Sequence, residues 1–202
     1  MKLPLRLKAE NIACERGGRL VFSNLSFAVK AGDMLELRGP NGSGKSSLLR
    51  LLAGLNTPSA GSITLENGVP DATLAEQAHY IGHADANKAA LTVVENLQFW
   101  SGFLGGDKIP LSAFNLATLA ADQALLLSAG QKRRLALSRL HTAPRCIWLL
   151  DEPDVGLDSP SRVVLKDQIT RHLESGGIVL VATHTDLGFK SATTLHLGDV
   201  KP

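Results

Sequence analysis

Residues 39–46 have the composition and spacing of a phosphate-binding loop. Their sequence, Gly-Pro-Asn-Gly-Ser-Gly-Lys-Ser, fits the pattern G-x-x-x-x-G-K-[ST] and lies between a predicted short strand and a leucine-rich stretch. Glycines let several backbone N–H groups approach a phosphate, and a following helix adds the positive end of its dipole. Lys45 supplies a cation for the β- and γ-phosphates, and the Ser46 hydroxyl suits Mg²⁺. The predicted phosphate site comprises Gly39, Pro40, Asn41, Gly42, Ser43, Gly44, Lys45, Ser46 and Ser47.

Two acidic residues and a histidine follow apolar runs further along the chain. Asp151 and Glu152 come directly after 147–150, and His184 comes shortly after 178–182. Because the carboxyl ends of parallel strands form one sheet edge, these side chains are expected beside the phosphate loop. Asp151 would hold Mg²⁺, Glu152 would orient and deprotonate a water, and His184 would contact the γ-phosphate and that water. Taken alone, the acids also suit a solvated turn, and the histidine suits a polar strand end.

The elements that must position these residues alternate between strands and helices. Strands apolar at every position suit a parallel sheet that is covered on both faces. An Ala- and Leu-rich stretch over about 84–127, interrupted by Gly105–Gly106 and Pro110, predicts a small helical subdomain inserted into an α/β body. Ser128 and Gln131 have capping-box spacing, which predicts a helix start. Strands are predicted at 5–13, 20–30, 34–38, 62–65, 146–150 and 178–182, with a turn at 16–18 between the first two and a hairpin turn at 67–68, and helices from the loop to 55 and over 159–175.

Composition limits the class of protein. The chain has 202 residues, a net charge of +2 and no long basic run, so nothing supports binding to nucleic acid. No stretch approaches about 18 apolar residues, and the N-terminus lacks the apolar core of a signal peptide, so direct membrane insertion is not expected. Cys14 and Cys146, the two cysteines, form no CxxC pair, and Cys146 suits a buried thiol.

Three further motifs narrow the class of nucleotide-binding protein. The segment 127–131, Leu-Ser-Ala-Gly-Gln, resembles the signature of ABC ATPases, with alanine in place of the first glycine, and 156–158 resembles their D-loop. With His184 as the switch histidine, the motif order matches that family over nearly the whole chain. The resemblance implies a single ABC-type domain over 1–202: an α/β P-loop NTPase with a parallel core sheet, an antiparallel β subdomain and the inserted helical subdomain.

The same resemblance implies a dimer and its nucleotide contacts. In the family, ATP with Mg²⁺ is held between the phosphate loop of one chain and the signature of another, so a homodimer is expected in the ATP-bound state. The signature and D-loop residues implied to contact the nucleotide are Ser128, Gly130, Gln131 and Asp158. A helix N-terminus at Ser128 would suit a γ-phosphate physically.

A closer resemblance is to the ATP-binding subunits of cytochrome c maturation (haem export) systems. It is carried by 127–137, by Ile-Gly-His at 81–83, by Leu-Thr at 91–92 and by Glu-Asn-Leu at 95–97. It implies ATP hydrolysis coupled to haem export or release from a haem carrier, integral membrane permease partners, and a peripheral place on the cytoplasmic face of the inner membrane. The alternatives are the ATPase of another solute transporter, a soluble ABC ATPase such as an iron–sulfur assembly factor, and a non-hydrolysing scaffold, against which Glu152 argues.

Two positions differ from the usual ABC ATPase sequence, and one pair of aromatic residues has two interpretations. ABC ATPases usually carry a glutamine where this chain has His83 or Ala84, and His83 or Asp85 is a candidate replacement. The aromatic residue that stacks on adenine is replaced by Arg16 or a neighbour, and a guanidinium also stacks on a base, which predicts weak base selectivity. Phe99 and Trp100 either line a groove for a partner helix or pack the core of the helical subdomain.

Overall fold

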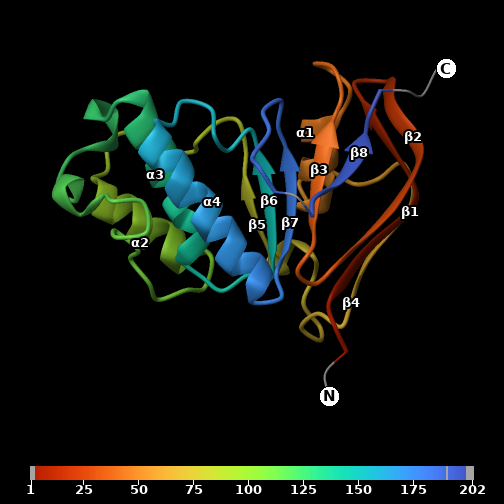
Figure 1. Ribbon diagram of the computed structural model, residues 1–202, viewed down its shortest axis with the longest axis horizontal. Coiled ribbons are helices and arrows are strands. Elements are labelled where there is room, and N and C mark those ends of the chain that lie inside the picture. Colours follow the sequence, from red (N-terminus) through yellow and green to blue (C-terminus); the bar gives the residue numbers. More distant parts are fainter. Residues whose placement is uncertain (1–2, 190, 199–202) are drawn as a thin grey trace. The chain divides into compact units, whose positions relative to one another are not determined.

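In the computed structural model, which describes residues 3–189 and 191–198, three of the predicted strands form the centre of a five-stranded sheet (Figure 1). β6 (Ile147–Asp151) and β7 (Ile178–Ala182) are buried at every position, and β3 (Met34–Arg38) pairs with β7. The pairs β3–β7 and β6–β7 are parallel, as predicted, and β3–β8 is parallel as well. The predicted strands 34–38 and 178–182 are confirmed at both ends, and 146–150 is shifted by one residue.

Two edge strands of this sheet were not predicted. The order is β5-β6-β7-β3-β8, with β5 at Ala78–Ile81 and β8 at Thr193–His196. Both strands have only four residues. β5 (Ala-His-Tyr-Ile) is interrupted by a histidine and β8 is mostly exposed, so neither has an apolar run. Their pairing depends on the strand beside them, which local sequence does not reveal.

A second, antiparallel sheet has the order β2-β1-β4. β1 (Arg6–Arg16) and β2 (Arg19–Lys30) form the predicted hairpin, and Gly17 and Gly18 turn the chain with φ of 56° and 74°. The second predicted hairpin, at 67–68, is wrong. β4 (Ala60–Glu66) pairs with β1 instead, and the chain beyond it turns away, with the Val69 N–H bonded to the side chain of Gln77 at 2.6 Å.

The first helix, α1 (Lys45–Leu52), begins directly after the phosphate-binding loop. It ends three residues before the predicted end at 55, because Gly54 takes φ of 71° and the Leu55 N–H bonds back to the Arg50 carbonyl at 2.9 Å. All four leucines of α1 are buried, in a cluster that includes residues of β3, β6 and β7. This packing fixes the helix N-terminus next to the ends of those strands.

The chain divides into two compact units. One comprises the described parts of 1–80, 146–152 and 170–202; the other, called here the helical unit, comprises 81–145 and 153–169. Within 84–127 only α2 (Val93–Phe103) is an α-helix, because Gly105–Gly106 and Pro110 interrupt the chain beyond it. The remaining elements are α3 (Ala129–Ser138), α4 (Ser159–Glu174), and four short 3₁₀ helices at Ala75–Gln77, Ala117–Leu119, Ala124–Leu126 and Arg139–His141. That the two units act as one ATPase domain remains a proposal.

Candidate nucleotide-binding site

The loop at 39–44 has a backbone that non-glycine residues rarely adopt. Gly39, Gly42 and Gly44 have φ of 142°, 82° and 101°. A Cβ on Gly39 would lie 2.1 Å from the Leu197 carbonyl oxygen, and one on Gly44 would lie 2.7 Å from the Val21 side chain. A Cβ on Gly42 would meet nothing within 4 Å, so the backbone there faces open space. The loop is therefore packed tightly on its protein side and accessible on the other.

Lys45, the first residue of α1, contacts through its side chain the loop that it is predicted to serve. Its Nζ donates to the carbonyl oxygens of Gly39 and Pro40 at 2.8 and 2.9 Å, and the residue is only 8% exposed. No side chain caps the N-terminus of α1 at Gly44. Uncapped N–H groups at a helix N-terminus, together with a nearby ammonium group, make a site for an anion.

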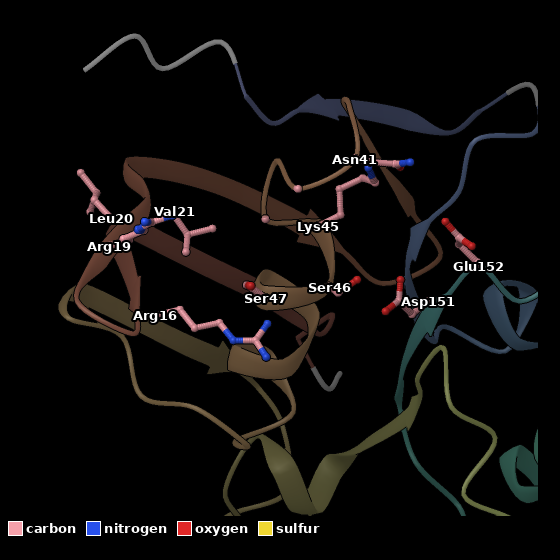
Figure 2. A pocket seen from close by; sticks show the side chains of 12 residues that line it. Arg16, Arg19, Leu20, Val21, Asn41, Lys45, Ser46, Ser47, Asp151 and Glu152 are labelled. Carbon is pink, nitrogen blue, oxygen red and sulfur yellow. The ribbon is translucent and has the colours of Figure 1, made fainter.

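A pocket of about 510 Å³ opens beside this loop (Figure 2). This volume is within the range of small-ligand sites. Asp151 and Glu152 lie on one side of the loop, and Arg16, Leu20 and Val21 on the other (Figure 2). The lining residues are Arg16, Arg19, Leu20, Val21, Asn41, Gly42, Gly44, Lys45, Ser46, Ser47, Asp151 and Glu152.

The register of the parallel sheet explains why the acids reach the loop. Leu37 and Asp151 both pair with Ala182, so the carboxyl ends of β3, β6 and β7 lie at one level. The phosphate loop begins at Gly39, directly after Arg38, the last residue of β3. Asp151 is 3% exposed at the end of β6, and both Asp151 and Ser46 line the pocket. The expected proximity of loop and acids is thus present in the structure.

Glu152 has an unusual backbone and a histidine neighbour. Its φ is 48°, which is uncommon for a residue with a long side chain, and its N–H donates to the Ala182 carbonyl at 2.8 Å. Its Oε1 lies 3.6 Å from Nε2 of His184, whose side chain is 47% exposed. A left-handed residue costs of order 1–3 kcal/mol and persists only where its surroundings hold it. Glu152 therefore lines the pocket from a backbone that its surroundings hold, and its carboxylate lies beside the histidine.

The pocket residues fit a magnesium nucleotide chemically. Within 3–189 and 191–198, no three His, Cys, Asp or Glu side chains cluster as a metal-binding set. Mg²⁺ at nucleotide sites needs only one or two protein ligands, because phosphate oxygens and waters complete its shell. The exposed Ser46 hydroxyl and the Asp151 carboxylate provide hard oxygen donors of that kind. These two side chains would hold Mg²⁺ in this pocket.

The signature residues start α3 in the helical unit. The predicted capping box is confirmed: Ser128 Oγ accepts from the Gln131 N–H at 3.3 Å, and Gln131 Oε1 accepts from the Ser128 N–H at 2.7 Å. A Cβ on Gly130 would lie 2.8 Å from the Gly156 carbonyl oxygen, which explains the need for glycine there. Since the Gln131 N–H serves the cap, binding a phosphate there would require exchange of that bond.

Asp158 of the D-loop caps the next helix. Its Oδ1 accepts from the Ser161 N–H at 3.0 Å, and the hydrogen bonds to Ser161 lower the pKa of its carboxyl. Because both it and the signature lie in the helical unit, their roles toward a nucleotide bound at the loop remain predictions.

Sequence reasoning found the loop and the acids but missed part of the site. Arg19, Leu20 and Val21 line the pocket because β2 returns beside Arg16, with Arg16 and Arg19 as register partners. The Gly-Gly turn signal predicted that hairpin but not its position over the phosphate loop. Asp85, a candidate replacement for the usual glutamine, accepts from Arg133 at 2.9 Å.

The family comparisons agree with this geometry. Residues 22–155 match the ABC transporter family. A "Cytochrome c biogenesis ATP-binding export protein CcmA" of Nitrobacter winogradskyi is 51% identical over 96% of this chain and 98% of its own length. One of the same name from Bradyrhizobium diazoefficiens is 46% identical over 97% of this chain and its full length.

Solved structures show the same fold at low identity. A putative ABC transporter ATP-binding protein of Pyrococcus furiosus has a TM-score of 0.81 at 22% identity, covering 95% of this chain and 97% of its own. Among the described residues, no helix has the length and apolar character needed to cross a membrane.

Proposed function

Since the chain belongs to the ABC transporter family and is related over nearly its whole length to cytochrome c biogenesis ATP-binding export proteins, we propose that it is the ATP-hydrolysing subunit of a haem export system for cytochrome c biogenesis. The observation that carries the ATPase assignment is the pocket in which the phosphate loop, Lys45, Asp151 and Glu152 meet. The relatives' name supports the link to cytochrome c biogenesis and export, and the resemblance at 127–137 supports haem as the exported group.

The proposed reaction is transfer of the γ-phosphoryl group of ATP to water. Loop N–H groups and Lys45 would hold the phosphates, with Lys45 exchanging one of its carbonyl partners for phosphate oxygens. Mg²⁺, held by Ser46 and Asp151, would neutralise charge on those oxygens. Glu152 would take a proton from the attacking water as the bond from the γ-phosphorus to the bridging oxygen breaks, leaving ADP and phosphate. His184, near Glu152, would contact the γ-phosphate.

The finer proposals concern assembly. We propose a head-to-tail homodimer in the ATP-bound state, with Ser128, Gly130, Gln131 and Asp158 of one chain completing the site on the other. The complex would include integral membrane permease subunits and would place this chain at the cytoplasmic face of the inner membrane.

The aromatic residues of α2 offer a surface for such a permease. The rings of Phe99 and Phe103 stack at 6.1 Å, and the two residues are 39% and 70% exposed. Lys88 Nζ lies 4.3 Å from the Phe99 ring centroid. Trp100 instead lies under Arg139, whose guanidinium is 4.5 Å from its ring. The sequence left two roles open for these aromatic residues, core packing and a partner surface. Trp100 packs within the helical unit, whereas Phe99 and Phe103 present an apolar surface.

Affinity recovery of the tagged chain from its native membranes tests the proposed function. We expect recovery with integral membrane proteins of cytochrome c maturation, together with ATPase activity. Recovery with another permease, or with soluble assembly factors only, would leave the ATPase and discard the haem assignment. Phe99→Ala/Phe103→Ala should lower membrane recovery without changing nucleotide affinity. Leu55→Ala, which trims an apolar side chain that is 62% exposed in the other unit and outside the nucleotide pocket, is the control for the recovery step.

Base selectivity is expected to be weak. Arg16, from the end of β1, lines the pocket with Arg19, Leu20 and Val21, and a guanidinium stacks on any purine without reading its edge. ATP and GTP should therefore be hydrolysed at similar kcat/KM, and Arg16→Ala should raise KM for both nucleotides to the same extent. The measurement is steady-state hydrolysis of each nucleotide. A strong ATP preference in the unmodified chain would contradict this expectation.

A further inference from the structure

Ser43, in the phosphate-binding loop, carries a buried hydroxyl that bonds to none of the residues that the structure describes. The residue is 9% exposed, and its Oγ is buried without a hydrogen-bond partner. Backbone lies close around it: a Cβ on Gly39 would be 2.8 Å from Ser43 Oγ, and one on Gly198 would be 3.2 Å from Ser43 Cβ. A buried hydroxyl without a partner lowers the stability of a fold. Its presence in this loop is explained if the hydroxyl is bonded in a second arrangement of the loop.

Lys45 is bonded to carbonyl groups of the same loop. Its Nζ donates to the carbonyl oxygens of Gly39 and Pro40 at 2.8 and 2.9 Å, so its side chain turns back over the loop (Figure 2). The Ser43 N–H donates to the Pro40 carbonyl at 3.2 Å, which places Ser43 beside the same peptide. The ammonium group and the Ser43 hydroxyl are therefore two donors near one pair of acceptors, and of the two only the ammonium group is bonded to them.

A nucleotide in the pocket changes the balance between these two donors. Its phosphates attract the ammonium group of Lys45, because two opposite full charges attract more strongly than a charge and a carbonyl dipole. When Lys45 turns to the phosphates, a loop carbonyl loses its donor, and a buried acceptor without a partner is costly. A serine hydroxyl moves between staggered positions by rotation about χ1, and it donates one hydrogen bond.

We propose that the Ser43 hydroxyl is the replacement donor of this loop. It is unbonded while Lys45 holds the carbonyl groups of Gly39 and Pro40, and it donates to one of them when Lys45 turns to the phosphates of a bound nucleotide. The exchange lowers the cost of nucleotide binding, because the vacated carbonyl gains a new partner. The hydroxyl acts on the loop and not on the reacting atoms, so it is a positioning group. This role rests on the proposed nucleotide-binding function, and the residues involved belong to one compact unit.

Ser43→Ala is expected to weaken nucleotide binding without lowering the stability of the free chain. The substitution leaves a loop carbonyl without a donor only when nucleotide is bound. The dissociation constant of a non-hydrolysable ATP analogue, measured by calorimetry, should therefore rise about 3- to 10-fold, the contribution of one hydrogen bond. In the complex purified from membranes, KM for ATP should rise while kcat is unchanged. The urea midpoint of the free chain should be unchanged or raised, because the substitution removes a buried group that has no partner.

Ser138→Ala is the matched control for the loss of a buried serine hydroxyl. Ser138 is 0% exposed, but its Oγ donates to the Arg134 carbonyl at 3.0 Å. Removal of a bonded hydroxyl should lower the urea midpoint and leave the affinity for the nucleotide unchanged. This pattern is the opposite of the one expected for Ser43→Ala.

The decisive measurement repeats Ser43→Ala in the Lys45→Met background. Lys45→Met removes the ammonium donor from the carbonyls of Gly39 and Pro40 in the free chain, so the Ser43 hydroxyl should already be bonded there. Ser43→Ala should then lower the urea midpoint, although it does not lower it when Lys45 is present.

Three results would each overturn the exchange of donors. These are a midpoint that Ser43→Ala lowers in the presence of Lys45, a midpoint that it does not lower in the Lys45→Met background, and an unchanged nucleotide affinity in Ser43→Ala. The unfolding measurements need no nucleotide, so they are independent of the proposed function. Failure of that function would be recognised separately, by unmodified chain that does not bind the ATP analogue.

Discussion

Replacing Glu152 by glutamine is expected to lower the rate of ATP hydrolysis by about 10²-fold or more, while ATP binding is retained. The amide keeps the size of the side chain but cannot accept the proton of the attacking water, and general-base catalysis contributes about this factor. Because hydrolysis would no longer separate the chains of the proposed homodimer, the variant should accumulate as an ATP-bound dimer. The measurements are phosphate release and the molecular mass in ATP and in ADP.

The backbone of Glu152 supplies an informative second variant. At φ of 48°, glycine is a better fit than glutamate, so Glu152→Gly should also lose hydrolysis but should not lose stability. A residue kept at a strained position in spite of this cost is expected where the side chain has a function. Glu66→Gln removes an exposed carboxylate from the same unit and is the control. Normal hydrolysis in Glu152→Gln would contradict the assignment of the base.

The fold could be predicted from the sequence where residues are buried on both sides of a strand. The run 178–182 has no polar position, and 34–38 is buried at its first four positions although it contains Glu36 and Arg38; the ends of both coincide with the observed strands. Prediction failed where an element depends on its neighbour. β8 is short and mostly exposed, and the hairpin expected at 67–68 was lost because β4 pairs with β1, more than forty residues earlier in the chain. Local turn signals cannot reveal that choice.

In the candidate site, too, the residues that belong to contiguous motifs could be predicted, whereas contacts between segments far apart in the chain could not. The phosphate loop and the acid pair are local motifs, and strand direction alone predicts that they meet at one sheet edge. By contrast, Arg133 has no local pattern that distinguishes it from Lys132 or Arg134 beside it. Its burial and its bonds to Gly82, Asp85 and Pro153 depend on segments up to 51 residues away. Such a contact can be found only once the chain is folded.

Replacing Lys45 by methionine is expected to weaken ATP binding by about 10²-fold. This variant changes the affinity for ATP, whereas Glu152→Gln changes the rate of turnover. A hydrogen bond from a charged group contributes about 1.5–3 kcal/mol, and 1.4 kcal/mol is a factor of ten in affinity. Methionine is similar in length but donates no hydrogen bond. The measurement is the dissociation constant for ATP by calorimetry, with hydrolysis followed in parallel.

Lys45 also serves the loop without nucleotide, so its two roles must be separated. Its ammonium bonds the carbonyls of Gly39 and Pro40, and Lys45→Met would leave both without this donor. Urea unfolding without nucleotide measures this structural loss, of order 1–3 kcal/mol. Lys30→Met, at the exposed end of β2, removes the same charge elsewhere in this unit and should change neither quantity. If Lys45→Met lost stability yet bound ATP like the unmodified chain, the lysine would hold only the loop, and the phosphate contact assigned to it would be wrong.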